Sequence, residues 1–370
     1  MTNAEKFMRQ AVDLARKAEG RTAPNPPVGA VLVRDGEVVG EGFHPAAGQP
    51  HAEIFALRQA GPLARGATLY VTLEPCCHHG RTGPCTAALI EAGVSRVLIG
   101  ATDPNPGVSG RGSAILQDAG VSVETGVLGQ TCRQLIAPFA KHVTSGLPYV
   151  LFKAAMTLDG RTATATGDSR WIPCLQSREL VHRLRDRVDG ILIGSGTVLA
   201  DNPRLTTRLA PGGRDPARIV VDSRLVTSSA AKVYSPESAV RRILVTGSHH
   251  PEQMLRPFLE RGVEVVRGSM RGQHLELGDI MKKLGSSGLL FLMLEGGAGL
   301  AGAMLRAGLI DRLMLFIAPR LLGGADGYPL LSGTGVANIE QAWQLTDVQS
   351  RQIGSDILIE GEMEYVHRPD

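Results

Sequence analysis

The sequence lacks several features that would assign it to a membrane or to nucleic acid. It has no apolar run of about 18 residues, so no membrane-spanning helix is expected. Aromatic residues make up only 4% and the net charge is +3, so the basic, aromatic-rich surface of a nucleic-acid-binding protein is absent. The opening segment carries charges throughout, unlike a secretory signal peptide. We therefore expect a cytoplasmic protein that binds neither membrane nor nucleic acid.

Cysteine is also scarce. The five cysteines are an odd number in a long chain, which argues against a disulfide framework and favours metal ligands or buried thiols. The 370 residues exceed the size of one ordinary hydrophobic core, and a composition of 43% hydrophobic and 20% charged residues is that of a globular protein. These numbers predict two folded domains.

Strand and helix patterns alternate along the whole chain. Two short apolar runs joined through Arg34-Asp35-Gly36 predict a hairpin, and strands and helices then alternate as far as Val127. A polar stretch around residues 141–148 interrupts the pattern before a new strand, YVLFKAAM. We therefore expect two α/β domains, residues 1–146 and 147–370.

Four residues of the first half form a metal-binding pattern. His51 and Glu53 lie in H-A-E at the start of an expected helix, and Cys76 and Cys85 each follow a proline. One imidazole and two thiolates give zinc three protein ligands and leave the fourth position open for water, as catalytic sites require. Zinc lowers the pKa of that water to about 7, and Glu53 is then free to carry protons. The pattern predicts one catalytic Zn²⁺ per chain.

Other assignments of these residues stay open. Cys77 is an alternative ligand to Cys76, although only Cys76 keeps the Pro-Cys pair, and His78 or His79 are less favoured alternatives. Each proline-cysteine pair also predicts the first turn of a helix, where proline is tolerated. Taken singly, such cysteines are more often small buried hydrophobes. A closed structural zinc site would need a fourth ligand and no neighbouring acid.

Asn25 lies in the rigid turn Pro24-Asn25-Pro26, just before the first expected strand. Its amide is suited to hydrogen-bonding the edge of a heterocycle. An ordinary turn asparagine is the other interpretation, because Asn-Pro is a common turn signal. The sequence alone leaves both open.

With these residues in view, the first half resembles the cytidine-deaminase-like family. The segments APNPPVGAV, HPAAGQPHAE, VTLEPCCHHGRTGPC and TDPNPGVSGRG are more specifically similar to the deaminase half of the bifunctional riboflavin-biosynthesis deaminase/reductases. This resemblance implies that His51, Cys76 and Cys85 bind zinc and that Glu53 is the proton donor. It implies a small-molecule substrate, a diaminopyrimidinone with a phosphoribosylamino group, that is hydrolysed to an aminouracil and ammonia.

The second half contains a possible phosphate-binding turn. Residues LLFLMLEGGAGLAGAML indicate a strand, a glycine turn and a helix with the spacing G-x-G-x-x-G. The acid that a Rossmann unit places after its next strand is missing, so we reject that fold but keep the phosphate cradle. Taken singly, the glycines are as well explained by close packing, Trp171 by core packing and Arg185 by a solvated helix face.

These segments resemble the reductase half of the same family, which has a dihydrofolate-reductase-like α/β fold and uses NADPH. The resemblance implies that the cofactor is lined by Ala155, Trp171, Thr197, Asp201, Ser223, Gly297, Ala298, Gly299, Leu300, Ala301 and Gly302. It implies that the phosphosugar is held by Ser169, Arg185, Leu205, Arg208 and Glu295, as Asn25 would hold the heterocycle in the first half. The implied reaction is hydride transfer to C1 of the ribosyl group, which opens it to ribityl.

Two rival functions remain at this stage. One is a deaminase of tRNA or free nucleosides, which the low charge and scarce aromatics disfavour. The other is a non-catalytic, zinc-stabilised binding module, which has no use for Glu53. The sequence leaves open whether the chain forms a homo-oligomer, and the tail beyond residue 340 carries no recognisable motif.

Overall fold

The computed structural model describes residues 2–78, 83–210, 212–237 and 239–365. It divides into two compact units, Met1–Leu147 and Pro148–Asp370. In the part of the chain that it describes, no helix has both the length and the apolar character needed to cross a bilayer.

The first unit is built on a five-stranded sheet in the order β2-β1-β3-β4-β5. β1 is antiparallel to both β2 and β3, whereas β3, β4 and β5 are parallel. Its elements are α1 (Asn3–Arg16), β1 (Gly29–Arg34), β2 (Glu37–Phe43), α2 (Ala52–Ala60), the 3₁₀ turn η1 (Gly61–Ala64), β3 (Thr68–Leu73), α3 (Cys85–Glu91), β4 (Arg96–Ala101), α4 (Arg111–Asp118), β5 (Ser122–Thr125), α5 (Gly129–Leu135) and α6 (Ala137–Ser145).

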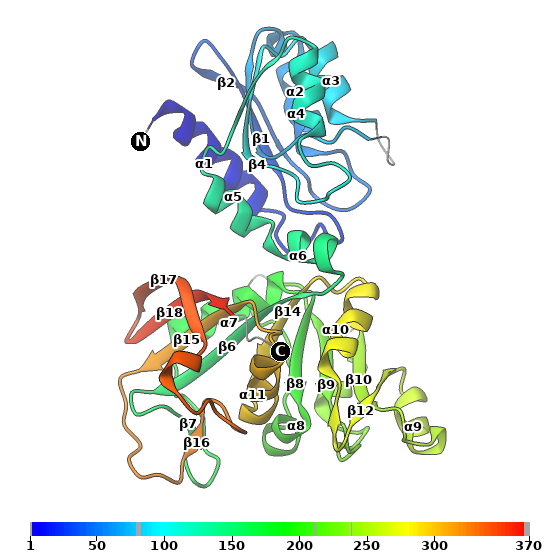
Figure 1. The fold of residues 1–370 in the computed structure, drawn as a ribbon, viewed down its shortest axis with the longest axis vertical. Helices are drawn as coiled ribbons and strands as arrows, with labels where there is room; N and C mark the ends of the chain where they lie inside the picture. The colour runs from blue at the N-terminus through cyan, green and yellow to red at the C-terminus, as the bar shows by residue number, and fades with distance from the viewer. Residues whose placement is uncertain (1, 79–82, 211, 238, 366–370) are drawn as a thin grey trace. The chain divides into compact units, whose positions relative to one another are not determined.

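Helices cover both faces of this sheet because alternate strand residues point to opposite sides. Ala30 and Leu32 of β1 join the core cluster beneath α2, α3 and α4, whereas Val31 and Val33 join the cluster beneath α1 and α5. Figure 1 shows these two helix groups on either side of the strands. The predicted hairpin between β1 and β2 is confirmed.

The second unit is built on a nine-stranded sheet in the order β11-β10-β9-β8-β14-β6-β15-β18-β17. Its elements are β6 (Tyr149–Thr157), β7 (Arg161–Ala163), α7 (Leu175–Arg187), β8 (Gly190–Gly194), α8 (Ser195–Asp201), β9 (Ala217–Val221), η2 (Lys232–Tyr234), β10 (Arg242–Gly247), α9 (Glu252–Leu259), β11 (Glu264–Gly268), β12 (Met270–Arg271), β13 (His274–Leu275), α10 (Leu277–Ser286), β14 (Phe291–Glu295), α11 (Ala298–Arg306), β15 (Arg312–Ala318), β16 (Tyr328–Pro329), η3 (Ile339–Gln341), β17 (Gln344–Ile353) and β18 (Asp356–Glu364).

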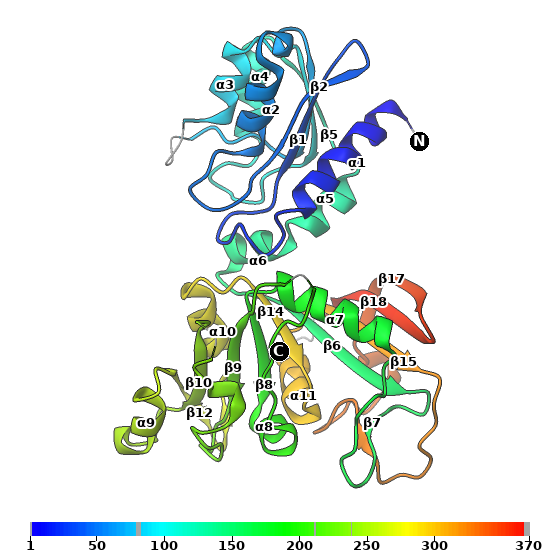
Figure 2. The same cartoon turned by 180° about the vertical axis from the view of Figure 1, so that it is seen from behind.

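Strands β11 to β15 of this order run parallel, so their carboxyl ends share one edge of the sheet. Loops at such an edge are the usual place for ligands in open α/β sheets. Figures 1 and 2 show α7 and α11 on opposite faces of these strands. The tail without a motif forms the antiparallel pair β17 and β18, which extends the sheet beyond β15.

Candidate active sites

Three elements of the first unit bring the predicted metal ligands together. His51 is the residue that caps α2, Cys76 lies in the loop after β3, and Cys85 is the first residue of α3. Their ligand atoms all lie within 4.8 Å of one another. His51 Nδ1 is 3.3 Å from Cys85 Sγ and 3.5 Å from Cys76 Sγ. One nitrogen and two sulfur atoms at this spacing suit zinc.

The cysteines differ in their backbone setting. Cys85 begins a helix, as its proline predicts, whereas the helix start predicted at Cys76 is wrong, because residues 74–77 form an extended loop. The Cys85 amide donates to Cys76 Sγ at 3.3 Å, and the Thr86 amide donates to the Cys76 carbonyl oxygen at 3.2 Å. The start of α3 therefore fixes the loop that carries Cys76. Hydrogen bonding from the Cys85 side chain lowers the pKa of the Cys76 thiol to about 4.

A close helix–strand contact places His51 and Glu53. A Cβ on Gly42 of β2 would lie 2.5 Å from the carbonyl oxygen of Ala52, so glycine there lets the start of α2 lie against the sheet. Glu53, in the first turn of α2, is only 3% exposed. Burial, followed by the charge of Cys76, raises the pKa of Glu53 to about 7. A carboxyl group with that pKa both takes up and releases protons near neutral pH.

These residues line a cavity of about 450 Å³, large enough for a small-molecule ligand. His44 and Asn25 form part of its wall. His44 Nδ1 is 3.0 Å from the carbonyl oxygen of Pro50, which can only accept, so Nδ1 carries the proton and Nε2 accepts from the Asn25 amide at 3.0 Å. The Asn25 oxygen is thereby left to accept from a ligand. The polar lining includes Asn25, His44, Glu53, His78, Asp103 and Asn105.

Sequence analysis missed Glu74, which organises one wall of this cavity. Its carboxylate accepts from the amides of Asp103 at 3.1 Å, Gly110 at 3.0 Å and Ser113 at 3.0 Å, and from the Ser113 hydroxyl at 3.2 Å. The one sequence feature that could have pointed to Glu74 is its position directly before Pro75-Cys76. Its partners lie about 30 to 40 residues away in sequence, so no local pattern could show them.

The alternative metal ligands have different outcomes. Cys77 is not a member of the ligand group, and His78 lines the cavity instead. His79 lies outside the described residues.

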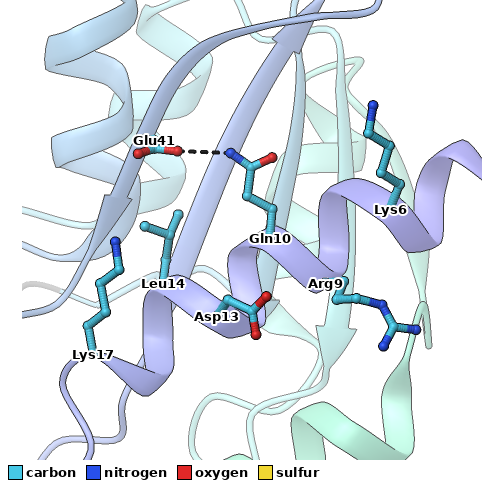
Figure 3. Close-up of a pocket in the computed structure, with 7 residues that line it drawn as sticks. All are labelled: Lys6, Arg9, Gln10, Asp13, Leu14, Lys17 and Glu41. Carbon is cyan, nitrogen blue, oxygen red and sulfur yellow. Dashed lines mark hydrogen bonds between the residues drawn. The ribbon is translucent and has the colours of Figure 1, made fainter.

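A second depression, on α1, has a mixed lining in which the basic side chains point apart (Figure 3). Gln10 donates to Glu41 there, and we assign it no function.

In the second unit, a carboxylate that is only 15% exposed lies between two cations. Arg185 Nη2 of α7 is 2.9 and 3.0 Å from the two oxygens of Glu295, at the end of β14. Lys153 Nζ of β6, a residue that the sequence analysis missed, is 3.2 Å from Glu295 Oε1. Burial acts to raise the pKa of Glu295, but Arg185 and Lys153 outweigh it and lower the pKa to about 2. Arg185 is thus buried rather than on a solvated helix face.

The segment 205–208 is held against α7 beside this cluster. Arg185 Nη1 donates to the carbonyl oxygen of Thr206 at 2.9 Å, and the Arg208 amide donates to His182 Nδ1 at 3.3 Å. Burial and the neighbouring arginines lower the pKa of His182 to about 4, so the ring stays neutral as an acceptor. Leu205 is buried, with a φ of 53°. These contacts bring the predicted substrate residues Arg185, Leu205, Arg208 and Glu295 to one place.

The glycine turn predicted to bind phosphate lies directly after Glu295. Gly296 and Gly297 have φ values of 73° and 79°, which favour glycine, and α11 begins at Ala298. A Cβ on Gly297 would lie 3.1 Å from Thr197 Oγ1, so the turn lies beside the first turn of α8, the helix that follows β8. Strand, turn and helix follow one another as predicted.

The remaining predicted cofactor residues are more dispersed. Ala155 lies in β6, Asp201 ends α8 and Ser223 follows β9. Ser169 and Trp171 lie in the loop before α7, where Trp171 is 62% exposed and therefore is not a core residue. The Arg178 guanidinium lies 4.1 Å from the centre of its ring. Gly302 packs against the Ser332 backbone, Ala301 is buried in α11, and Gly299 and Leu300 lie in its first turn.

Family comparisons agree with these two sites. Residues 1–101 match the cytidine and deoxycytidylate deaminase zinc-binding region, and residues 148–359 match the RibD C-terminal domain. Fold and site therefore define a deaminase unit joined to a reductase unit. The chain is 41% identical over 353 residues to a riboflavin biosynthesis protein RibD of Aquifex aeolicus, covering 95% of this chain and 96% of that protein. It is 42% identical over 367 residues to RibD of Escherichia coli, with 96% and 98% covered.

Solved structures give the same assignment. RibD of Acinetobacter baumannii superposes with a TM-score of 0.83 at 36% identity, covering 98% of this chain and 99% of that one. The diaminohydroxyphosphoribosylaminopyrimidine deaminase/5-amino-6-(5-phosphoribosylamino)uracil reductase of Thermotoga maritima gives a TM-score of 0.84 at 36% identity, with the same coverage. The chain belongs to the RibD family, and it is a bifunctional enzyme of riboflavin biosynthesis with deaminase and reductase activities.

Proposed function

We propose that residues 1–146 remove the ring amine of a diaminopyrimidinone carrying a phosphoribosylamino group, and that residues 147–370 reduce the deaminated product with NADPH. The observation that carries the deaminase half is the grouping of His51, Cys76 and Cys85 around one cavity with Glu53. The substrate is inferred from the Thermotoga maritima relative, a diaminohydroxyphosphoribosylaminopyrimidine deaminase and 5-amino-6-(5-phosphoribosylamino)uracil reductase. All five cysteines are free, which supports a reducing compartment such as the cytoplasm.

The ligand set fits one zinc ion per chain. Two thiolates and one imidazole are soft and borderline ligands, and among the described residues these three converge, which leaves one position of a tetrahedral zinc ion for water. Zinc, when bound, supplies a Lewis acid that makes water nucleophilic at neutral pH. His51, Cys76 and Cys85 would hold it, and Glu53 stays out of the ligand set to handle protons.

The protein's own groups account for the remaining steps of deamination. Glu53 takes one proton from the attacking water and passes it to the ring nitrogen, and then carries the proton of the newly added hydroxyl to the departing amine. The exocyclic C–N bond breaks, the amine leaves as ammonia, and the ring carbon becomes a carbonyl. His44 holds the side-chain amide of Asn25 in place, and the free oxygen of that amide accepts a hydrogen bond from the heterocycle. Glu74 fixes the wall that carries Asp103 and Asn105.

In the reductase half, the cluster of Glu295, Arg185 and Lys153 binds the sugar portion of the substrate. Glu295 stays ionised between its two cations, so its carboxylate accepts hydrogen bonds from sugar hydroxyls in a fixed direction. The turn at Gly296 and Gly297 fits the phosphates of a dinucleotide, because it has no side chain, has positive φ at both residues and directly precedes helix α11. NADPH supplies the hydride that reduces C1 of the ribosyl group.

Product analysis tests both halves in one experiment. The full-length protein is incubated with the phosphoribosylamino-diaminopyrimidinone, with and without NADPH, and the products are identified by mass. We expect the deaminated product without NADPH and the deaminated ribityl product with it. Recovery of unchanged substrate in both reactions, from zinc-loaded protein, would contradict the proposal.

Cysteine variants test the metal ligands. We expect Cys85→Ser to lower the zinc content and abolish deamination, because only two ligands then remain. Cys77→Ser is the matched control, since Cys77 is outside the ligand group. This variant should keep its zinc and its deaminase activity. Zinc content is measured by elemental analysis of the purified proteins. Loss of zinc in Cys77→Ser together with its retention in Cys76→Ser would reverse the assignment.

A further inference from the structure

The order of strands predicts where the far end of the cofactor lies. Glu295 and the glycine turn follow β14, and Thr197 follows β8, the neighbouring strand. β9 and β10 come next in the same parallel order, so their carboxyl ends continue the same edge (Figures 1 and 2). If the reacting end of NADPH lies at Glu295 and its phosphates at the glycine turn, its adenosine extends toward the ends of β9 and β10.

An unpaired cation is found at that position. Arg224, three residues after the end of β9, is exposed, and among the described residues it has no hydrogen-bond or ion-pair partner. Arg218, within β9, is in contrast 2% exposed and lies 3.6 Å from Asp215. Arg224 therefore has no structural partner that would explain its charge.

The acid beside it is turned away. Asp222 is fully buried, and its Oδ2 accepts from both the amide and the hydroxyl of Thr227 at 2.8 Å. In Rossmann folds, which this unit does not adopt, an acid binds the ribose hydroxyls of NAD, whereas an arginine accommodates the extra phosphate of NADP. Here the acid holds its own loop, and the arginine faces solvent.

The end of β10 adds a second basic group. His250 Nε2 lies 2.9 Å from the carbonyl oxygen of Ser223, which ties the two strand ends together. The ring of His249 lies 4.0 Å from that of His250 and is exposed. Ser223, Arg224 and His249 thus border one stretch of the sheet edge.

We propose that Arg224, together with His249 in the segment after β10, binds the 2′-phosphate on the adenosine ribose of NADPH and so selects NADPH over NADH. This inference rests on the proposed reductase function. A guanidinium donates two parallel hydrogen bonds to one phosphate, and NADH has no group there to receive them.

Binding measurements on the full-length protein test this role. The dissociation constants for NADPH and NADH are measured by calorimetry for the parent, Arg224→Ala and Arg224→Lys. We expect Arg224→Ala to weaken NADPH binding about tenfold or more and to leave NADH binding unchanged, because one charge-assisted contact is lost. Arg224→Lys should retain part of the preference, since lysine still supplies a point charge.

Arg261→Ala is the matched control. Arg261 is also exposed, but it lies between α9 and β11, at the amino end of β11 and so at the other edge of the sheet. It should change neither constant. Adenosine 2′,5′-bisphosphate should compete with NADPH in the parent better than AMP does, and this advantage should disappear in Arg224→Ala.

Two results would overturn the inference. One is that Arg224→Ala weakens the binding of NADPH and of NADH by the same factor. The other is that the parent protein binds NADPH and NADH with the same dissociation constant. Either result leaves the reductase proposal intact if the parent still reduces the deaminated substrate. A parent that binds neither dinucleotide would instead contradict the reductase proposal itself.

Discussion

Glu53, which is buried in the first unit, and Glu295, whose side chain is 15% exposed in the second, have opposite acidities. Among the described residues, the titratable groups that act on the Glu53 carboxyl are thiols and an imidazole, and burial raises its pKa to about 7. Burial also acts on Glu295, but Arg185 and Lys153 contact its carboxylate directly, and its pKa falls to about 2. Burial alone therefore does not decide whether a carboxyl group is charged. At Glu295 the two neighbouring cations decide it.

The difference matches the two tasks that we propose. A proton carrier must exchange its proton near neutral pH, and Glu53 is placed to do so. A group that orients a sugar must keep one charge state, and Glu295 is held ionised. If this comparison is correct, removing each carboxylate should damage a different property of the enzyme.

The largest effect is expected from Glu53→Gln. Glutamine keeps the size of the side chain but carries no exchangeable carboxyl proton, so deamination should fall about 10²- to 10⁴-fold. Ammonia release measures the rate. Zinc content should match the parent, and the reduction of already deaminated substrate should persist, because Glu295 and its neighbours are unaltered. A variant that deaminates at nearly the parent rate would refute the role of Glu53.

A smaller effect, on stability, is expected from Glu295→Gln. It leaves Arg185 and Lys153 buried without their carboxylate, and breaking such a pair should cost about 3 kcal/mol. Both tryptophans, Trp171 and Trp343, lie in the second unit, so their fluorescence during urea unfolding reports on it. Glu264→Gln is the control, because its ion pair with Arg241 is partly exposed and should contribute under about 1 kcal/mol. If Glu295→Gln and Glu264→Gln lost the same unfolding free energy, the Glu295 ion pairs would contribute no more than an ordinary surface pair.

The smallest effect is a pH dependence that follows from the same group. The pKa of Glu295 is lowered from 4.5 to about 2 in the folded chain, so its stabilising contribution is present above 4.5 and is lost as the pH falls toward 2. The difference in unfolding free energy between the parent and Glu295→Gln should therefore narrow over that interval. A difference that stays constant between pH 5 and pH 3, measured with the same fluorescence signal, would show that the charge of Glu295 does not matter.

Local sequence patterns predicted most of the helices and strands of both units. The Asp35-Gly36 pair predicts the first hairpin because both residues adopt positive φ, at 52° and 83°. The alternation of strands and helices likewise predicts two α/β units. Strands β17 and β18 were missed. β17, at the edge of the sheet, is polar and exposed along most of its length and so carries no buried-strand pattern, and β18 lies between it and β15.

The sites were only partly visible in the sequence. H-A-E and the two Pro-Cys pairs are local signals, and the structure groups His51, Cys76 and Cys85 together, although zinc binding by them stays a prediction. Lys153 was missed because a lysine in an apolar strand gives no sign of its partner, and Glu295 is 142 residues away. Such pairs depend on strand order, which no short segment encodes.

The contacts of Glu74 also have a consequence for the mobility of the cavity wall. The amides of Asp103, Gly110 and Ser113 donate to its carboxylate, which is only 3% exposed. Amides of loops and of the first turn of a helix normally exchange their hydrogens with solvent quickly, because they have no backbone partner. The loop amide of Asp103 and the amides of Gly110 and Ser113 at the start of α4 can exchange only when the carboxylate separates from them. In deuterated water all three should therefore exchange as slowly as amides of the central strands.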